Sequence, residues 1–250
     1  MASPVPPSPT SLSSHYLAQS ALAEGLRRAL SALWPEIDVQ DLNGSLPAFK
    51  AAAFALTNRF SMASASLASR DYSRRRIAAG VRSSFTVPIA PAPPQEQVDN
   101  AVGWATKSLW DRALLDSPTS PRAASVLDAA QANIEGAVEK MVLDVGRATT
   151  VEAVAKDPKA RAWARETKPG CCYFCALMAS RGAVYSSARA AGDGNTYHDH
   201  CRCTVVPVFG PFEATAHARQ WAADYEGLKK SLGHSPSLSD WRQHYDAQAG

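Results

Sequence analysis

The chain has 250 residues, of which 46% are hydrophobic and 20% are charged, so it can bury one sizeable core or two small ones. Its formal net charge of +3 permits contact with DNA but does not by itself indicate a nucleic-acid-binding protein. No stretch reaches the roughly 18 apolar residues that a membrane span requires, and the N-terminus lacks a signal-peptide pattern. We therefore expect a protein that is made and kept in a cytoplasm and contacts no membrane.

The first part of the chain is predicted to be helical after a disordered start. Residues 1–12 are rich in Pro and Ser and have little to bury. Leucines recur every three or four residues over 13–33, which predicts an amphipathic helix that stops before Pro35. A long Ala-rich helix is expected over 46–79, with Pro47 in its first turn. Its apolar stripe needs a cover, either within this chain or from another protein.

A compact basic run lies at the end of this second helix. It comprises Arg70, Arg74, Arg75, Arg76 and Arg82. Charge clusters of this kind usually face water, so we interpret the run as a solvated helix end.

Proline then interrupts the helical pattern. Four prolines within 84–96 predict an extended linker between two helical halves. Helical patterning resumes at 98–115 and again at 122–155. Ser120 and Pro121 are the predicted N-cap and first helical residue of the last segment.

The character of the sequence changes after Pro158. Short strands are predicted at 160–167, 182–187 and 201–209, and a final helix at 212–232. The fold class is therefore mainly α, with an elongated helical N-terminal region and a small α+β Cys/His module near the C-terminus. The expected organisation is a disordered start at 1–12, a helical region at 13–83, a Pro-rich linker at 84–96, a helical region at 97–156, the Cys/His module at 157–212, and a C-terminal helix and tail at 213–250.

The sharpest local signal is a pair of metal-ligand motifs. Cys172 and Cys175 form a C-x-x-C knuckle, and His198, Cys201 and Cys203 follow about two dozen residues later. Two ligand pairs separated by a loop suit a tetrahedral zinc site, because each pair comes from a tight local turn. We predict a structural zinc ion held by Cys172, Cys175, His198 and Cys201, with Cys203 as the competitor for the fourth place. Zinc would supply much of the folding energy of so small a module.

The conformation of residues 201–203 bears on this choice. If the segment is extended, Cys201 and Cys203 point to one face while Arg202 points away, so both sulfurs could approach one ion. His200 would then lie on the side of Arg202, as a surface residue. Two alternatives to zinc stay open, namely reduced thiols packed as small apolar residues and disulfides formed outside a reducing compartment.

Three classes of enzyme share parts of this pattern. A zinc nucleobase deaminase needs an upstream H-x-E motif, but the only upstream histidine is His15. A papain-like nucleophile would pair one Cys with His198 or His200, and the neighbouring thiols favour a structural role instead. An HNH-type nuclease with His198, Asp199 and His200 is the one enzyme alternative that we retain. We predict a protein without enzymatic activity and without a small-molecule substrate.

Three segments carry a family resemblance: Trp163–Thr167, Gly170–Tyr185 and Tyr197–Pro207. Together they resemble the C-terminal module of MuF-like phage minor head proteins, in the variant common among phages of actinobacteria. The resemblance covers about 157–212, and C-x-x-C followed by H-x-x-C-R-C-x-x-x-x-P is specific in combination. The chain departs from the family's H-P-x-C-R-C in having Asp199 in place of proline. The chain also has Cys171 and His200, which are not part of the family pattern.

The resemblance implies a phage structural protein, a minor capsid component that acts in head morphogenesis. Such proteins join the procapsid near the portal, and some are delivered with the DNA. The implied partners are the portal or the major capsid protein, with the packaged DNA as a further partner. The implied location is the capsid interior of the virion, and the host cytoplasm during assembly. We expect no fused toxin or protease domain, since only one short helix and a tail follow the module.

Three functional hypotheses remain at this stage, and the third is a host-directed effector carried in the phage head. In the first, the Ala-rich helix at 46–79 offers its apolar stripe to the portal or another head protein. In the second, a DNA-binding or HNH-like nuclease module built on the zinc knuckle presents Arg181, Arg189 and Arg202 to phosphates.

Overall fold

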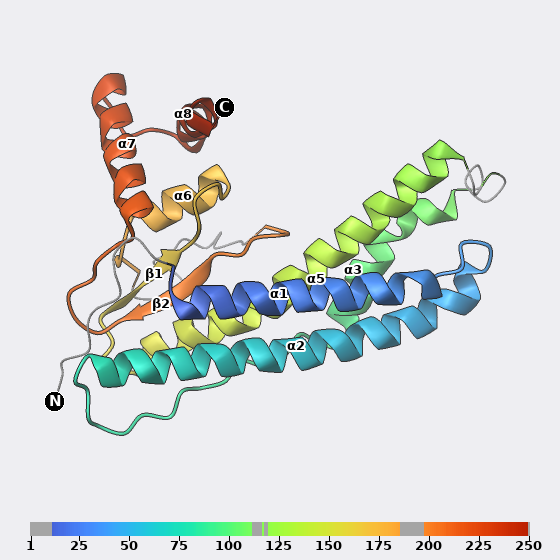
Figure 1. Cartoon of the computed structure of the whole chain (residues 1–250), viewed down its shortest axis with the longest axis horizontal. Coiled ribbons are helices and arrows are strands. Elements are labelled where there is room, and N and C mark those ends of the chain that lie inside the picture. The colour runs from blue at the N-terminus through green and yellow to red at the C-terminus, as the bar shows by residue number, and fades with distance from the viewer. Residues whose placement is uncertain (1–11, 112–116, 118–119, 186–197, 250) are drawn as a thin grey trace.

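A computed structural model describes residues 12–111, 117, 120–185 and 198–249 (Figure 1). The fold is mainly helical, as predicted, and the small two-stranded sheet lies at one end of a long helical bundle. The elements are α1 (Ser14–Leu33), η1 (Trp34–Glu36), α2 (Leu42–Ala78), α3 (Gln95–Ala105), η2 (Lys107–Trp110), α5 (Pro121–Lys156), β1 (Ala162–Glu166), α6 (Tyr173–Ser180), β2 (Thr204–Val208), α7 (Ala216–Leu232) and α8 (Leu238–Ala249).

Capping side chains set the helix starts. Ser120 Oγ accepts the backbone N–H of Ala123, which confirms the predicted start of α5. The long helix α2 begins at Leu42 instead of 46, because the Asp41 carboxylate caps it by accepting the N–H of Gly44 at 2.9 Å. Pro47 therefore lies inside the helix, beyond its first turn. The sequence prediction missed this start, since Gly44 and Pro47 weaken the helical pattern there.

The segment predicted as a linker packs against the bundle instead of separating two helical halves. Val87 and Ala90 are buried, and the backbone N–H of Ala90 donates to Thr149 Oγ1 on α5 at 3.1 Å. The helix that follows, α3, ends at Ala105 and continues as the short 3₁₀ helix η2. The prediction of a helix over 98–115 was thus too long, and residues 112–116 lie outside the described part.

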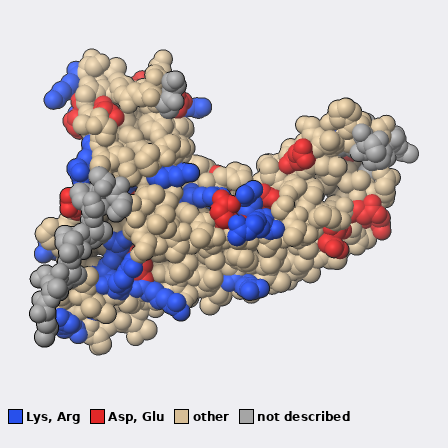
Figure 2. Space-filling view, in the orientation of Figure 1, with Lys and Arg blue, Asp and Glu red and all other residues tan. Residues whose placement is uncertain are grey.

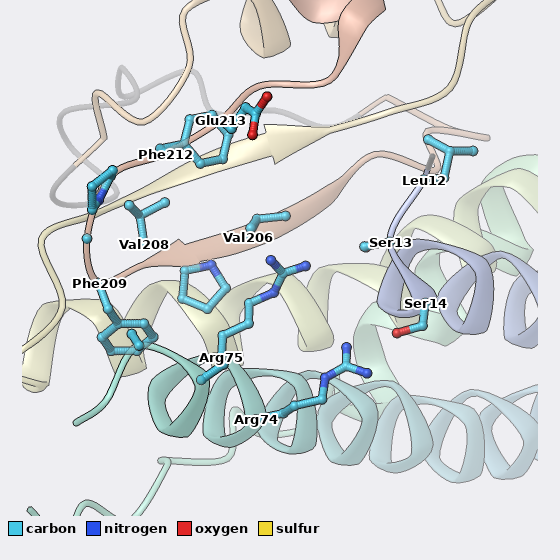
Figure 3. Close-up of a pocket in the computed structure, with 15 residues that line it drawn as sticks. Leu12, Ser13, Ser14, Arg74, Arg75, Val206, Val208, Phe209, Phe212 and Glu213 are labelled. Carbon is cyan, nitrogen blue, oxygen red and sulfur yellow. The ribbon is translucent and has the colours of Figure 1, made fainter. Parts of the chain in front are cut away.

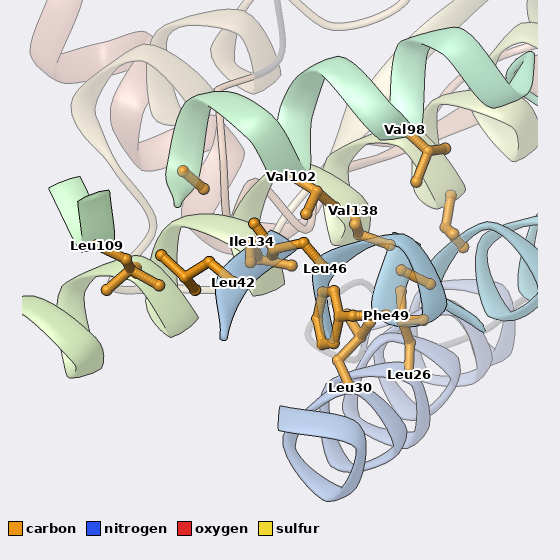
Figure 4. Close-up of a cluster of buried hydrophobic side chains, with 14 residues drawn as sticks. Leu26, Leu30, Leu42, Leu46, Phe49, Val98, Val102, Leu109, Ile134 and Val138 are labelled. Atoms are coloured by element: carbon orange, nitrogen blue, oxygen red, sulfur yellow. The ribbon is translucent and has the colours of Figure 1, made fainter. Parts of the chain in front are cut away.

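Helices α1, α2, α3 and α5 share one hydrophobic core (Figure 4). Leu26 and Leu30 of α1 meet Phe49 of α2, and Val102 of α3 lies close to Ile134 of α5. The apolar stripe of α2 is therefore covered within the chain. This favours the intramolecular interpretation of the stripe, although Met62 is 50% exposed.

A glycine on α5, Gly146, lies where α5 closely approaches α1 and α2. A Cβ on Gly146 would lie 2.9 Å from Gln19 Nε2 on α1 and 3.1 Å from the backbone oxygen of Ser64 on α2. The two flanking side chains bond to each other, with Ser64 Oγ and Gln19 Oε1 at 2.9 Å. The backbone oxygen cannot move away without moving α2.

We expect Gly146→Ala to lower the free energy of unfolding by about 1–3 kcal/mol, because the added methyl group overpacks this crossing. The matched control is Gly103→Ala on α3, where the nearest atom to the new Cβ is Lys50 Nζ at 3.8 Å. That change should stabilise the protein by about 0.5–1 kcal/mol through helix propensity. Urea unfolding of both variants measures the difference, and equal effects would contradict the close packing.

The basic run at the end of α2 is not simply a solvated helix end, as the sequence suggested. Arg76 is buried, and its Nε lies 2.7 Å from Oδ2 of Asp157, whose side chain is fully buried. Burial acts to raise the pKa of Asp157, but hydrogen bonds led by that from Arg76 hold the pKa below its ordinary value. Arg74 and Arg75 pair with Asp71, and both arginines line a pocket that Val206 and Val208 of the C-terminal strand also line (Figure 3). The run thus ties the end of α2 to the end of α5.

The sheet joins the C-terminal module to the bundle. β1 and β2 are antiparallel, with Ala162 opposite Val208, and β2 packs against α5 and α2. Trp163 is fully buried and stacks on Tyr185 at 4.4 Å between ring centroids. Of the strand predicted at 182–187, the structure describes residues 182–185, which form an isolated bridge between Tyr185 and Trp163. Residues 186–197 lie outside the described part.

Two helices in the module were missed by the sequence analysis. The short helix α6 carries the C-x-x-C knuckle, and α8 occupies the stretch expected to be a tail. Trp241 of α8 is buried, and its indole N–H donates to the backbone oxygen of Tyr173 at 2.7 Å. The predicted helix at 212–232 begins at Ala216, because the Thr215 hydroxyl caps it.

Candidate metal centre

The knuckle is formed by the first turn of α6. Cys172 is the N-cap residue of this helix, and its Sγ accepts the backbone N–H of Cys175 at 3.4 Å. A helix N-terminus presents free N–H groups and the positive end of the helix dipole, so it favours a thiolate there. Cys175 is 3% exposed and lies in a cluster of buried sulfurs with Cys201 and Cys203.

The second group of ligands comes from the segment that leads into β2. His198 Nε2 lies 2.8 Å from Cys172 Sγ. Cys201 Sγ lies 3.4 Å from Cys175 Sγ and 3.4 Å from Cys203 Sγ. The structure therefore brings all five predicted residues together, although the two groups are about two dozen residues apart in the sequence.

The potential ligand atoms form two overlapping triads. One consists of Cys172, Cys175 and His198, and the other of Cys175, Cys201 and Cys203. Within each triad all ligand atoms lie within 4.8 Å of one another. Zinc bonds of about 2.3 Å to sulfur and 2.0 Å to nitrogen fit such a group, so the cluster could bind a metal ion. Cys175 belongs to both triads, which makes it the central ligand.

The cysteines form no disulfide. All five are free, and a separation of 3.4 Å between sulfurs is far longer than the roughly 2.05 Å of a disulfide bond. The fifth cysteine, Cys171, stands apart from the triads, with its Sγ 3.9 Å from the hydroxyl of Tyr245.

Electrostatics favours anionic sulfur at both ends of the cluster. Hydrogen bonds from the Cys175 thiol and backbone, with a further one from His198, lower the pKa of Cys172 to about 5. Hydrogen bonds from Cys175 and Cys201, aided by nearby arginines, place the pKa of Cys203 well below its ordinary value. The pKa of Cys175 is raised, most of all by its hydrogen bond with Cys172. Sulfurs with a lowered pKa at two positions favour binding of a soft divalent cation.

One face of α5 holds the ligand segment in place. Arg147 is buried, and its Nε donates to the backbone oxygen of Cys203 at 2.9 Å while Nη2 donates to that of Cys201. Glu139, two turns before Arg147 on α5, accepts a hydrogen bond from Nε of Arg202 at 2.8 Å. The cluster is thus anchored to the bundle as well as to its own module.

A glycine on the same face of α5 allows His200 to pack closely. A Cβ on Gly136 would lie 2.6 Å from His200 Nε2, so only glycine leaves room for the ring in this position. His200 is exposed, in agreement with the prediction of a surface residue, and has a left-handed backbone conformation with φ 61°. Neither Gly136 nor Arg147 could be found from the sequence, because α5 and the ligand segment are more than 50 residues apart.

The role predicted for Arg202 in phosphate binding is wrong. Its guanidinium pairs with Glu139, which is 1% exposed, and with Glu24 on α1. These two carboxylates raise the pKa of Arg202 and neutralise its charge. Arg189, also proposed for phosphate contact, lies outside the described residues, and Arg181 is exposed.

The nuclease alternative finds little support in the surroundings of His198. Its Nε2 faces Cys172, and its Nδ1 lies 2.7 Å from the backbone oxygen of Asp199. Both ring nitrogens therefore have partners within the cluster. This is the arrangement expected of a histidine ligand in a structural metal site, where one nitrogen faces the metal position and the other is oriented by a hydrogen bond.

Fold and site together define a mainly helical protein with a small α+β Cys/His module. The chain belongs to the VG15 protein family, whose model matches residues 7–228. This membership points to a phage protein. No curated protein and no solved structure matches the chain. Among the described residues, no helix is long and apolar enough to cross a membrane.

Proposed function

We propose that this protein is a non-enzymatic minor capsid protein of the MuF-like class, built into the phage procapsid near the portal. The observation that carries the proposal is the VG15 family match over residues 7–228. The MuF-like sequence pattern adds to it, since its cysteines and His198 converge in one cluster. The centre then has a structural role, because a metal ion joining α6 to the segment before β2 would rigidify the module.

The far end of the bundle offers a surface for a head partner. Trp104 and Trp110 are 67% and 48% exposed, although tryptophan is usually well buried. They flank the junction of α3 and η2, close to the start of α5, where Arg122 pairs with Asp111 at 3.1 Å. Exposed tryptophans are the side chains that most often dominate the energy of protein interfaces. We place the contact with the portal or the major capsid protein at these two residues.

We expect the double substitution Trp104→Ala and Trp110→Ala to reduce incorporation into particles tenfold or more, since each hot-spot side chain contributes about 2 kcal/mol. The measurement complements a phage lacking this gene and quantifies the protein in purified particles by mass spectrometry. The control replaces Ile77 and Ile89, which are 61% and 46% exposed elsewhere, by Ala. Cross-linking of wild-type procapsids identifies the partner.

Two different failures are distinguishable. If wild-type particles and procapsids lack the protein, the proposed function itself is wrong. If the tryptophan variant is incorporated as well as the isoleucine control, the protein is a head component that docks through another surface.

A further inference from the structure

Positive charge is concentrated on α2 and the segment after it. Residues 42–95 contain one acidic residue, Asp71, which is buried and paired with Arg74 and Arg75. The same stretch contains seven basic residues: Lys50, Arg59, Arg70, Arg74, Arg75, Arg76 and Arg82. Figure 2 shows basic side chains spread over the module-side half of α1 and α2, with acidic ones at the far turn between these helices.

Several of these cations border one seam, the outer groove between the antiparallel helices α1 and α2. Arg59 lines a shallow hollow of this seam together with Ala29 and Ala32 of α1. Arg70 and Arg74 line a second hollow together with Ser14, His15 and Ala18 of α1, and Asp71 of α2 lines it as well. The seam is therefore basic on its α2 side over most of its length.

Arg28 adds a cation from the α1 side. Its Nη2 lies 4.0 Å from the position of a Cβ on Gly25, and Phe60 of α2 lies 3.5 Å from the same point. Arg28 thus borders the seam between the two hollows. We call this set of cations, Arg28, Arg59, Arg70 and Arg74, the basic seam.

Helix geometry sets the spacing of the basic seam. Arg59 and Arg70 are eleven residues apart, which is close to three turns and places them on one side of α2. At about 1.5 Å per residue, the row from Arg59 to Arg74 extends over roughly 22 Å. Small residues such as Ala29, Ala32 and Ala52 line the hollow near Arg59, so a partner can approach the backbone closely.

Most of these charges are available to a partner. Arg28, Arg59 and Arg70 are exposed. Among the residues that the structure describes, none of these three forms an ion pair, whereas Arg27 pairs with Glu24 and Arg76 with Asp157. Unpaired exposed guanidinium groups in a row are an electrostatic complement to a linear polyanion.

We propose that the basic seam binds the phosphate backbone of double-stranded DNA, without sequence preference. Duplex DNA carries one charge per about 1.7 Å of its axis, so a segment of roughly 22 Å carries on the order of ten phosphate charges, and those on its facing side can contact the seam. Arginine forms bidentate hydrogen bonds with phosphate and is suited to such contacts. The family resemblance implies packaged DNA as a partner but assigns it no surface. The proposal assigns this contact to the basic seam, which is separate from the docking surface of the proposed capsid function and uses none of the residues of the metal centre.

The test measures binding of the full chain to a fluorescent duplex of about 20 base pairs by anisotropy, between about 50 and 200 mM salt. The seam variant combines Arg28→Gln, Arg59→Gln and Arg70→Gln. The control combines Lys168→Gln, Lys229→Gln and Lys230→Gln, three exposed residues of the C-terminal module, and changes the net charge equally. Circular dichroism confirms that both variants keep the helical content of the wild type.

We expect wild-type binding to weaken steeply with salt. In the seam variant Kd should rise tenfold or more, and the slope of log K against log salt should fall by about three, close to one unit for each lost contact. The control should stay within about twofold of the wild type.

Three outcomes would overturn the proposal. The first is that the wild-type protein fails to bind the duplex at the lowest salt concentration. Both variants could weaken binding equally, which would mean that net charge alone is responsible. Finally, the seam substitutions could abolish binding to phosphatidylglycerol vesicles and leave DNA binding intact, which would assign the seam to a lipid surface. None of these outcomes bears on particle incorporation, so the capsid proposal is tested separately.

Discussion

Cys175→Ser is expected to abolish zinc binding and to unfold the C-terminal module. Cys175 is the one residue shared by both triads, it is buried, and its Sγ lies 3.4 Å from that of Cys201. Its loss removes a ligand whichever of Cys201 and Cys203 completes the site. Structural zinc contributes on the order of 10 kcal/mol to the folding of small domains, so the module should lose several kcal/mol of stability.

The matched control is Cys171→Ser, which removes the thiol next to the knuckle, one that belongs to neither triad. Elemental analysis should find about one zinc per chain in the wild type and in this control, and none in Cys175→Ser. Near-ultraviolet circular dichroism follows the module through Trp163 and Trp241, which are buried there. A comparison of Cys201→Ser with Cys203→Ser then identifies the fourth ligand.

Two results would contradict the zinc prediction. Wild-type protein without metal and with five titratable thiols would mean that the sulfurs pack as reduced side chains. Protein without metal and with missing thiols would indicate disulfides formed between neighbouring sulfurs.

Arg147→Met should weaken both the fold and the metal centre. The buried guanidinium donates to the backbone oxygens of Cys201 and Cys203 and pairs with Asp144 at 2.7 Å. Methionine fills a similar volume but leaves these buried acceptors without their donor. We expect a loss of about 3–5 kcal/mol in the free energy of unfolding, as for other broken buried charge networks.

The control for this variant lies on the same helix. Lys140 also pairs with Asp144, at 2.7 Å, but both side chains are 31% exposed. Lys140→Met should therefore cost less than about 1 kcal/mol. Urea unfolding measures stability, and competition with a chromophoric chelator measures zinc affinity. Equal effects of the two substitutions on both quantities would show that Arg147 does not position the ligand segment.

Local patterns predicted much of the helical structure. The leucine spacing over 13–33 and the pair Ser120–Pro121 located α1 and α5 almost to the residue, because caps and periodicity act within a few residues. The Cys and His residues of the cluster were also identified, since C-x-x-C and H-x-x-C are short motifs. Helix α8 was missed because its apolar face, which includes Trp241, is recognisable only once α6 lies against it.

The sequence by itself determined the helical class, the position of the long helices and the identity of the five cluster residues, because these depend on interactions between near neighbours. Only the tertiary structure decided what covers α2, why Arg76 and Arg202 are unavailable to a ligand, and which residues of α5 hold the cluster. Each of these depends on groups brought together from distant parts of the chain. The same holds for the basic seam, since its arginines form one surface only because α1 and α2 pack antiparallel.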